Sequence, residues 1–398
     1  MTKFRTFEHL HNIADVNCGN DVLQALQGTG FDHILRIQSK LNHCHGLVES
    51  FARCYDVNTS CFRISNDVEL YITLLDVLCI TGLPIVGKPV IGSQVDGERE
   101  CISCFGVVPA LYEHKKGLKL NVLKDLAENG DSFEHRVRAA ALLVIGSIIA
   151  PDTSNRCVNA FYCPLVQNIN EIRDFAWGEA TLVNLYYGLR MFKERKRNGV
   201  TGSTSLLSLF ALQYIRPLLD FIGISTRPPL NFPLIVDWCR EMNRASKNDA
   251  IIWQPWQLHQ NLPQGVRQQM NVALAIKPML WINICIYHQP HMTPRQLGLS
   301  NETLEAMREW FRTNVTDTFI EKPGLSGKGG KNYTELWGPQ IEAINRINEQ
   351  NWLVGEEDDL AAEANEAGVE EDPCPMGDVD EADLFYVCND EMDPHPSE

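Results

Sequence analysis

The chain has 398 residues, of which 44% are hydrophobic and 22% charged, with 27 Gly and 20 Pro. This composition is typical of a globular protein and excludes collagen, coiled-coil and wholly disordered chains. Residues 355–398 hold 17 of the 51 acidic residues and no Lys or Arg, which leaves 34 acids against 35 bases in residues 1–354. The net charge of −16 therefore belongs to the C-terminal segment, and no overall attraction to nucleic acid or to an anionic membrane is expected.

The N-terminal residues contain no continuous apolar segment typical of a secretory signal, so we expect an intracellular protein. The longest apolar run, Ala139–Ala150, is too short to cross a bilayer. The 13 Cys follow no regular spacing, which is typical of reduced thiols. These features favour a cytosolic or nuclear protein without membrane contact.

Two short strand patterns lie in the N-terminal part of the chain. Residues 60–64 and 68–72 flank one turn, and residues 85–86 and 90–91 flank a second turn. Apolar residues on both sides of a tight turn are typical of a β-hairpin. We therefore predict one or two short hairpins, with the strand signals of the chain concentrated in this region.

A helix is predicted between the two hairpins. Thr73 is a capping residue with Asp76 three residues later, and Gly82 followed by Pro84 is typical of a helix end. A second helix begins at Ser132. Further helical patterns cover residues 41–53, 118–128, 132–151, 178–196, 203–215, 232–244, 266–287, 301–311 and 333–352. The predicted fold class is mainly α, a large helical domain with short hairpins near its start.

The acidic C-terminal tail is predicted to be disordered, because few apolar side chains are available to offset the entropy of an ordered chain. One apolar cluster within it is flanked by acids and either docks on a partner or has no partner. This cluster consists of Leu384, Phe385, Tyr386 and Val387. The predicted division is an N-terminal extension (1–29), a helical domain (30–352, with a subdivision near 198–203 as an alternative) and the tail (353–398).

The motifs of common enzymes and metal sites are missing from the sequence. The Gly/Lys-rich segment 322–331 does not match a nucleotide-binding P-loop. Cys101 and Cys104 form a single C-x-x-C pair without a second pair at zinc-site spacing. The cluster at 43–45 (His-Cys-His) lies in a helical pattern, where alternate residues point apart. We predict no catalytic residue, no metal and no cofactor.

Four basic residues, Lys193, Arg195, Lys196 and Arg197, lie at the end of one predicted helix. Cations at this position complement the helix dipole, so a solvated helix end is one interpretation. A nuclear-import or nucleic-acid-binding patch is the other, because an exposed run of Lys and Arg offers several charges to a receptor or a phosphate backbone.

Four blocks of residues, rich in aromatic rings, Gly-Pro turns and helix caps, carry a family resemblance. The first block contains Phe62, Thr73, Asp76, Gly82 and Pro84, and the second contains Trp177 and Gly178. The third runs from Trp253 through Pro255 to Trp256, and the fourth contains His288, Pro290, Arg295, Gln296 and Gly298. In this order the blocks resemble the motifs of the plant mobile domain, a helical module of plant transposable elements and of nuclear maintenance-of-meristems proteins. Phe51, Asn58 and His291 depart from the family pattern.

The resemblance implies a nuclear, non-enzymatic interaction protein of transposable-element origin, with the cytoplasm as the alternative location. It implies a role in transposon silencing, gene expression or genome maintenance, and protein partners that are phosphatase-like or chromatin-associated. The motif residues are expected to fix turns and bury rings. The family carries the label "aminotransferase-like", but this sequence shows no site for a Schiff-base Lys with a phosphate cradle. The alternatives are a nucleic-acid-binding accessory protein of a transposon and an unrecognised enzyme.

Overall fold

The computed structural model describes residues 4–8, 11–14, 16–36, 45–92, 96–106, 112–113, 117–151, 153, 156–215, 218, 251–258, 263–323 and 333–349. Residues Met1–Leu353 form one compact unit, and Val354–Glu398 form a second unit that lies outside the described residues. The predicted tail with its cluster Leu384, Phe385, Tyr386 and Val387 therefore lies outside the described residues, as does the predicted helix 232–244.

The described part of the first unit is mainly helical. Its α-helices are α1 His11–Ala14, α2 Asn20–Ala25, α3 Phe31–Leu35, α4 His45–Cys54, α5 Leu74–Thr81, α6 Gly97–Phe105, α7 Leu120–Asn129, α8 Phe133–Val144, α9 Cys163–Val166, α10 Trp177–Lys193, α11 Thr204–Tyr214, α14 Gln264–Arg267, α15 Met270–Leu274, α16 Pro294–Leu297, α17 Asn301–Asn314 and α18 Tyr333–Leu336. Residues 338–349 are also helical. In the described part of the chain, no helix is both long enough and apolar enough to cross a membrane.

The strands are short and form four small sheets. They are β1 Arg5–Thr6, β2 Phe62–Arg63, β3 Glu69–Leu70, β4 Tyr112–Glu113, β5 Gly117–Lys119, β6 Cys157–Val158, β7 Gly199–Val200, β8 Lys277–Trp281, β9 Ile284–His288 and β10 Phe319–Glu321. The first pair, β1–β7, is parallel, and the sheets β2–β3, β4–β5–β6 and β8–β9–β10 are antiparallel. No sheet in the described part of the chain has more than three strands.

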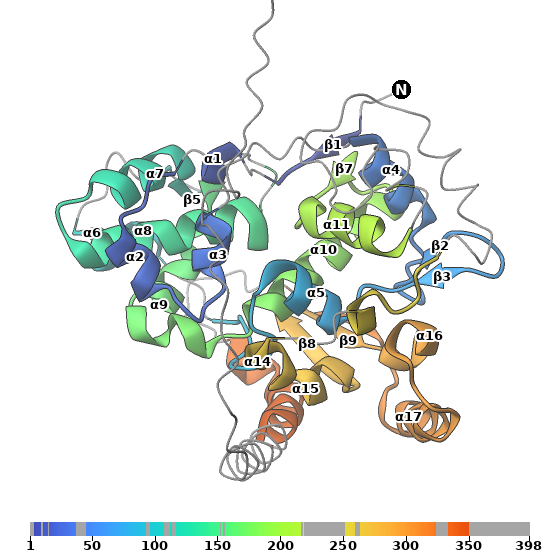
Figure 1. Ribbon diagram of the computed structural model, residues 1–398. Coiled ribbons are helices and arrows are strands. Elements are labelled where there is room, and N and C mark those ends of the chain that lie inside the picture. Colours follow the sequence, from blue (N-terminus) through green and yellow to red (C-terminus); the bar gives the residue numbers. More distant parts are fainter. Residues whose placement is uncertain are drawn as a thin grey trace, which may run out of the picture. The chain divides into compact units, whose positions relative to one another are not determined.

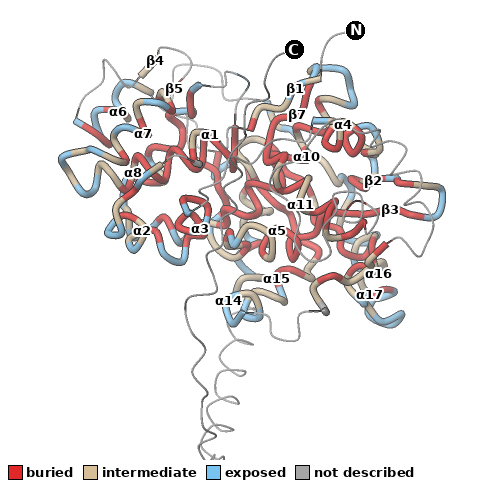
Figure 2. The backbone as a smooth tube through the Cα atoms, turned by 45° about the horizontal axis from the view of Figure 1, so that its top comes forward, coloured by how far each residue is buried: buried red, intermediate tan, exposed pale blue. Residues whose placement is uncertain are grey.

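Helix α10 runs through the core (Figures 1 and 2). Of its 17 residues, 13 are buried, as expected for a helix that is apolar around most of its circumference. Its first turn packs in a hydrophobic cluster with α2, α3, α6, α7, α8 and α9, and its later turns pack in a second cluster with α4, α5 and α11. In Figure 1 the helices of the first cluster lie to the left of α10, and α4 lies to its right.

The helix predicted after Thr73 is confirmed as α5. The Thr73 hydroxyl accepts a hydrogen bond from the Asp76 N–H, and the Asp76 carboxylate accepts one from the Thr73 N–H, which completes a capping box. Gly82 ends the helix in the left-handed conformation with a φ of 69°, which a residue without a Cβ adopts at little cost. Ser132 likewise caps α8, which continues as a π-helix over Ile145–Ile149.

The first predicted hairpin is confirmed as β2–β3, but the second is wrong. Residues 85–91 do not pair with one another. Lys88 forms a bridge with Phe175, and Val90 forms one with Trp281. Each predicted strand has only two residues and the intervening Pro89 has no N–H to donate, so pairing with distant segments replaces the hairpin.

The predicted helix over 266–287 is also wrong in its second half. The chain forms the short helices α14 and α15 and then the hairpin β8–β9. The apolar spacing of this segment fits a helix, but its Ile residues and Tyr287 favour a strand. Ile282, with a φ of 53°, supplies the tight turn. The longest strands of the described chain therefore lie far from the N-terminal region where the strand signals were predicted.

Residues before position 30, predicted to be an extension, contribute to the compact unit. Strand β1 pairs with β7, and the buried Glu8 carboxylate accepts hydrogen bonds from the start of α11. The donors are the Ser203 hydroxyl (2.8 Å), the Thr204 hydroxyl (2.9 Å) and the Ser205 N–H (2.7 Å). A carboxylate at this position satisfies a free N–H group and complements the helix dipole.

Candidate functional site

The buried carboxylate of Asp76 joins two of the family blocks, the first and the third, at the start of α5. Its Oδ2 accepts hydrogen bonds from the N–H (2.7 Å) and the hydroxyl (2.6 Å) of Thr73. Its Oδ1 accepts one from the Tyr214 hydroxyl and one from the Trp256 indole N–H, both at 2.7 Å. Burial raises the pKa of Asp76, and these hydrogen bonds oppose that rise. Asp76 therefore fixes α5 against α11 and the Trp253–Trp256 segment.

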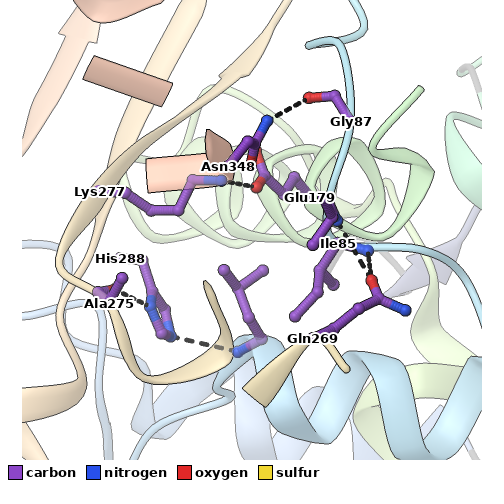
Figure 3. Close-up of polar contacts among 10 residues, drawn as sticks. Ile85, Gly87, Glu179, Gln269, Ala275, Lys277, His288 and Asn348 are labelled. Carbon is purple, nitrogen blue, oxygen red and sulfur yellow. Dashed lines mark hydrogen bonds and ion pairs between the residues drawn. The ribbon is translucent and has the colours of Figure 1, made fainter. Parts of the chain in front are cut away.

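His288 supports the same end of α5 from the sheet. Its Nε2 accepts a hydrogen bond from the Leu74 N–H (3.2 Å), and its Nδ1 lies 2.8 Å from the Ala275 carbonyl oxygen (Figure 3). The proton is accordingly assigned to Nδ1. Burial lowers the pKa of His288 to about 3, so the ring is neutral at pH 7. Both nitrogens are therefore occupied by main-chain groups.

Gln296 and Arg295, neighbours in the fourth block, make different contacts. The Gln296 side-chain oxygen accepts a hydrogen bond from the Tyr71 N–H (2.8 Å), and its nitrogen donates to the Tyr71 carbonyl (3.0 Å). The guanidinium of Arg295 is exposed and lies 5.2 Å from the centre of the half-buried Trp253 ring. Gln296 thus pairs with the main chain just before α5, and Arg295 covers an aromatic surface.

Trp177 and Gly178 connect the second block to the first. The Trp177 ring is fully buried, and its indole N–H donates to the Ile172 carbonyl (2.7 Å). The Gly178 N–H donates to the Pro84 carbonyl (2.8 Å), and a Cβ at Gly178 would lie only 2.9 Å from the Leu83 carbonyl oxygen. The close approach of α10 to the Gly82–Pro84 turn therefore requires glycine.

The remaining motif residues lie at element ends or in the core. The buried Phe62 ring packs against Phe51, with ring centres 5.4 Å apart. Pro255 and Pro290 each begin a short 3-10 helix, and Gly298 ends α16 with a φ of 64°. The blocks that are scattered in the sequence therefore meet around α5 and the first turn of α10.

A buried ion pair between Glu179 of α10 and Lys277 of β8 was not predicted. The exposed fractions of these side chains are 1% and 0%, and the Lys277 ammonium donates to the Glu179 Oε1 (Figure 3). Within the described residues, the Glu179 Oε2 has no hydrogen-bond partner. Burial raises the pKa of Glu179, and the Lys277 charge opposes that rise. The pair ties the hairpin β8–β9 to the start of α10.

A cavity of about 490 Å³ lies at the other end of α5. Its walls come from the turn between α2 and α3, the C-terminal end of α5, and the segment around α14 and α15. The lining residues are Gly28, Gly30, His33, Leu78, Cys79, Gly82, Pro84, Trp256, Pro263, Gly265, Val266 and Gln269. Trp256 therefore takes part in both the Asp76 cluster and the cavity wall.

The single C-x-x-C pair lies in α6, where Cys101 and Cys104 are both buried. The Cys104 Sγ donates to the Cys163 carbonyl (3.6 Å), so its surroundings are those of a core thiol. In the parts of the chain that the structure describes, no group of three His, Cys, Asp or Glu could hold a metal ion.

The basic residues after α10 are mostly engaged by neighbouring groups. The Lys193 ammonium donates to the Arg53 carbonyl (2.6 Å), and the Lys196 ammonium lies 2.8 Å from a Glu194 carboxylate oxygen. The Arg197 guanidinium donates to the Thr201 hydroxyl (3.2 Å). Of these contacts, only the ion pair with Glu194 offsets a positive charge. Arg195 is exposed.

Sequence reasoning missed Tyr214, Trp256, Glu179, Lys277 and Gln269. The sequence does single out Trp256, because it ends the third block, but only Trp253 and Pro255 of this block were predicted as motif residues. The Asp76 partners lie 138 and 180 residues away in the chain, and Lys277 lies 98 residues from Glu179. No spacing rule connects residues that are this far apart.

Comparison with known proteins places these features in a family. The plant mobile domain family model matches residues 34–322, and no solved structure matches the chain significantly. The chain therefore belongs to the plant mobile domain family, as the resemblance predicted.

Three relatives from Arabidopsis thaliana show the extent of this similarity. Protein MAIN-LIKE 2 is 26% identical over 345 residues, which cover 77% of this chain and 50% of that protein. Protein MAINTENANCE OF MERISTEMS is 25% identical over 282 residues, which cover 64% and 56%. A serine/threonine-protein phosphatase 7 long form homolog is 25% identical over 195 residues, which cover 42% and 14%. The chain thus spans about half the length of the first and second relatives.

Proposed function

We propose that the chain is a non-enzymatic interaction module that works in the nucleus, in transposon silencing, gene expression or genome maintenance, and that it derives from a transposable element. The observation that carries this proposal is the use of the family's polar motif residues inside the core. Asp76, His288 and Gln296 each accept a hydrogen bond from a main-chain N–H at or just before the start of α5. These buried residues stabilise the fold, and the fold presents a fixed surface to other molecules.

The chemistry of these residues supports a structural role over catalysis. A general acid or base must reach a substrate and change its protonation state near the working pH. His288 has both ring nitrogens bonded to main-chain groups and a pKa of about 3. Asp76 accepts four hydrogen bonds and has no exposed surface. Neither group is accessible to a substrate, and His288 does not change its protonation state near pH 7.

Protein partners are the class that we favour. The relative named as a phosphatase contains a segment similar to this chain, which supports phosphatase-like partners, and chromatin-associated proteins are the second group. The near-neutral body gives little support to nucleic acid as the main partner.

Affinity capture from plant nuclei, combined with a hydrolase and transferase screen of the full chain, tests this function. We expect reproducible protein partners and no turnover. The informative variant is His288→Ala, with Tyr187→Phe as a surface control. An activity that disappears in His288→Ala while the melting curve stays unchanged would refute the proposal.

A further inference from the structure

The cavity beside α5 has the size of a ligand site. Its volume of about 490 Å³ falls within the range of roughly 300–1,000 Å³ that is typical of such sites. Three segments that are far apart in the sequence build its walls, so the fold holds its shape. No residue of the cavity except Trp256 takes part in the Asp76 cluster.

The walls of the cavity offer an uncharged surface. The Trp256 indole N–H is bonded to Asp76, the Gln269 side-chain oxygen accepts from two main-chain N–H groups, and its nitrogen donates to the Gly265 carbonyl. Burial raises the pKa of Cys79 to about 12, so its thiol is neutral at pH 7. Among the described residues, no Asp, Glu, Lys or Arg lines the cavity. These walls suit an apolar group that can lie against the Trp256 ring.

The lining residues Gly28, His33 and Gly265 are exposed, so the cavity reaches the surface beside them. A Cβ built on Gly265 would meet no atom within 4 Å, and the same holds for Gly28. Gly265 has no positive φ, so a side chain there would project into free space without backbone strain. The cavity is therefore accessible from outside, and a single substitution can obstruct it.

Two exposed Arg residues lie close in the chain to residues that line the cavity. Arg36 ends α3 one turn after His33, and Arg267 follows Val266 in α14. Both side chains are exposed, and neither has an ion-pair partner among the described residues. His33 has an exposed side chain with its Nδ1 3.7 Å from the Asp32 carboxylate. An apolar interior with a basic rim complements a ligand that has an apolar group between acids.

We propose that this cavity binds a bulky apolar side chain presented by an acidic peptide segment of a partner protein. This inference deepens the proposed function and rests on it. The apolar side chain enters beside Trp256, Leu78 and Val266, and the flanking carboxylates lie near Arg36 and Arg267. The cavity interior provides most of the affinity, and the rim charges provide selectivity and salt dependence.

The test is fluorescence anisotropy with the full chain and a fluorescein-labelled peptide, Asp-Glu-Asp-Leu-Phe-Asp-Glu-Asp. Gly265→Trp fills the opening and should weaken binding at least about tenfold. Gly265→Ala is the conservative control. Gly338→Trp is the matched control, because a Cβ there also meets no atom within 4 Å and Gly338 does not line the cavity. Both controls should keep the affinity within about twofold.

Two further comparisons separate the interior from the rim. A peptide with Ala-Ala in place of Leu-Phe should bind at least about tenfold more weakly. Arg36→Gln with Arg267→Gln should weaken binding and flatten its salt dependence. Saturable binding that Gly265→Trp leaves unchanged would overturn the inference, as would the absence of binding to the acidic peptide.

The failure of this inference can be distinguished from the failure of the proposed function. If Gly265→Trp still captures the same nuclear partners and the peptide does not bind, the cavity is not the docking site, and the interaction function stands. If the peptide binds as expected but a turnover activity depends on His288, the proposed function fails.

Discussion

His288 illustrates how a residue type associated with catalysis can serve a helix end instead. Its ring accepts a hydrogen bond from one of the N–H groups that lack a partner within α5, and it donates a hydrogen bond to a carbonyl of the neighbouring segment. Protonation would place a donor against the Leu74 N–H within the core. The fold therefore holds the neutral ring, and the low pKa of His288 follows from this arrangement.

This arrangement predicts a pH dependence of stability. The folded-state pKa of His288 is about 3, whereas an unfolded His titrates near 6.5. The unfolded chain therefore binds the additional proton between these values, and stability falls as the pH drops below 6.5. Between pH 7 and pH 5 the wild type should lose about 2 kcal/mol more than His288→Gln. Urea unfolding at both pH values measures this, and equal losses would contradict a neutral, buried His288.

The Asp76 carboxylate predicts a second measurable effect. Tyr214→Phe and Trp256→Phe each remove one donor to Oδ1, and each should lower the free energy of unfolding by about 1–3 kcal/mol. The control is Tyr187→Phe, whose hydroxyl donates to Glu321 at an exposed position, with an expected change below about 0.5 kcal/mol. If the losses were no larger than that of the control, the hydrogen bonds of Asp76 to Tyr214 and Trp256 would not stabilise the fold.

The hairpin β8–β9 is held to α10 by an ion pair inside the core. Charges are costly to bury, and their mutual attraction offsets this cost only when both partners are present. Lys277→Met alone should therefore destabilise the protein by about 3–5 kcal/mol. The double variant Glu179→Leu with Lys277→Met should recover most of the loss. Denaturant unfolding of the three proteins decides this, and a double variant as unstable as Lys277→Met would refute the interpretation.

Elements with local signals could be predicted from the sequence, and those that depend on distant partners could not. Thr73 and Gly82 mark the two ends of α5 by their own side-chain and backbone chemistry. The strands β8 and β9 were missed because a short apolar segment fits both periodicities, and their pairing decides between them. The motif residues were assigned a structural role from their chemistry, but their meeting around α5 became visible only in the fold.

For the whole molecule, the distribution of charge limits the range of partners. The excess of acids over bases lies in residues 355–398, and the body is close to neutral. Binding of the full chain to duplex DNA should therefore be weak, without the steep loss of affinity with salt that several phosphate contacts produce. Titrations at two salt concentrations check this. A tight complex with a steep salt slope would favour the nucleic-acid-binding alternative.

The thermal melting curve of His288→Ala, recorded on the full chain beside the wild type, decides whether the family motif builds the fold or performs a reaction. Loss of the ring leaves the Leu74 N–H and the Ala275 carbonyl without partners in the core. A destabilisation of about 2–4 kcal/mol, which lowers the melting temperature by about 3–5 °C, is expected. An unchanged melting temperature would contradict the structural role of His288 and would favour the alternative that the chain is an enzyme.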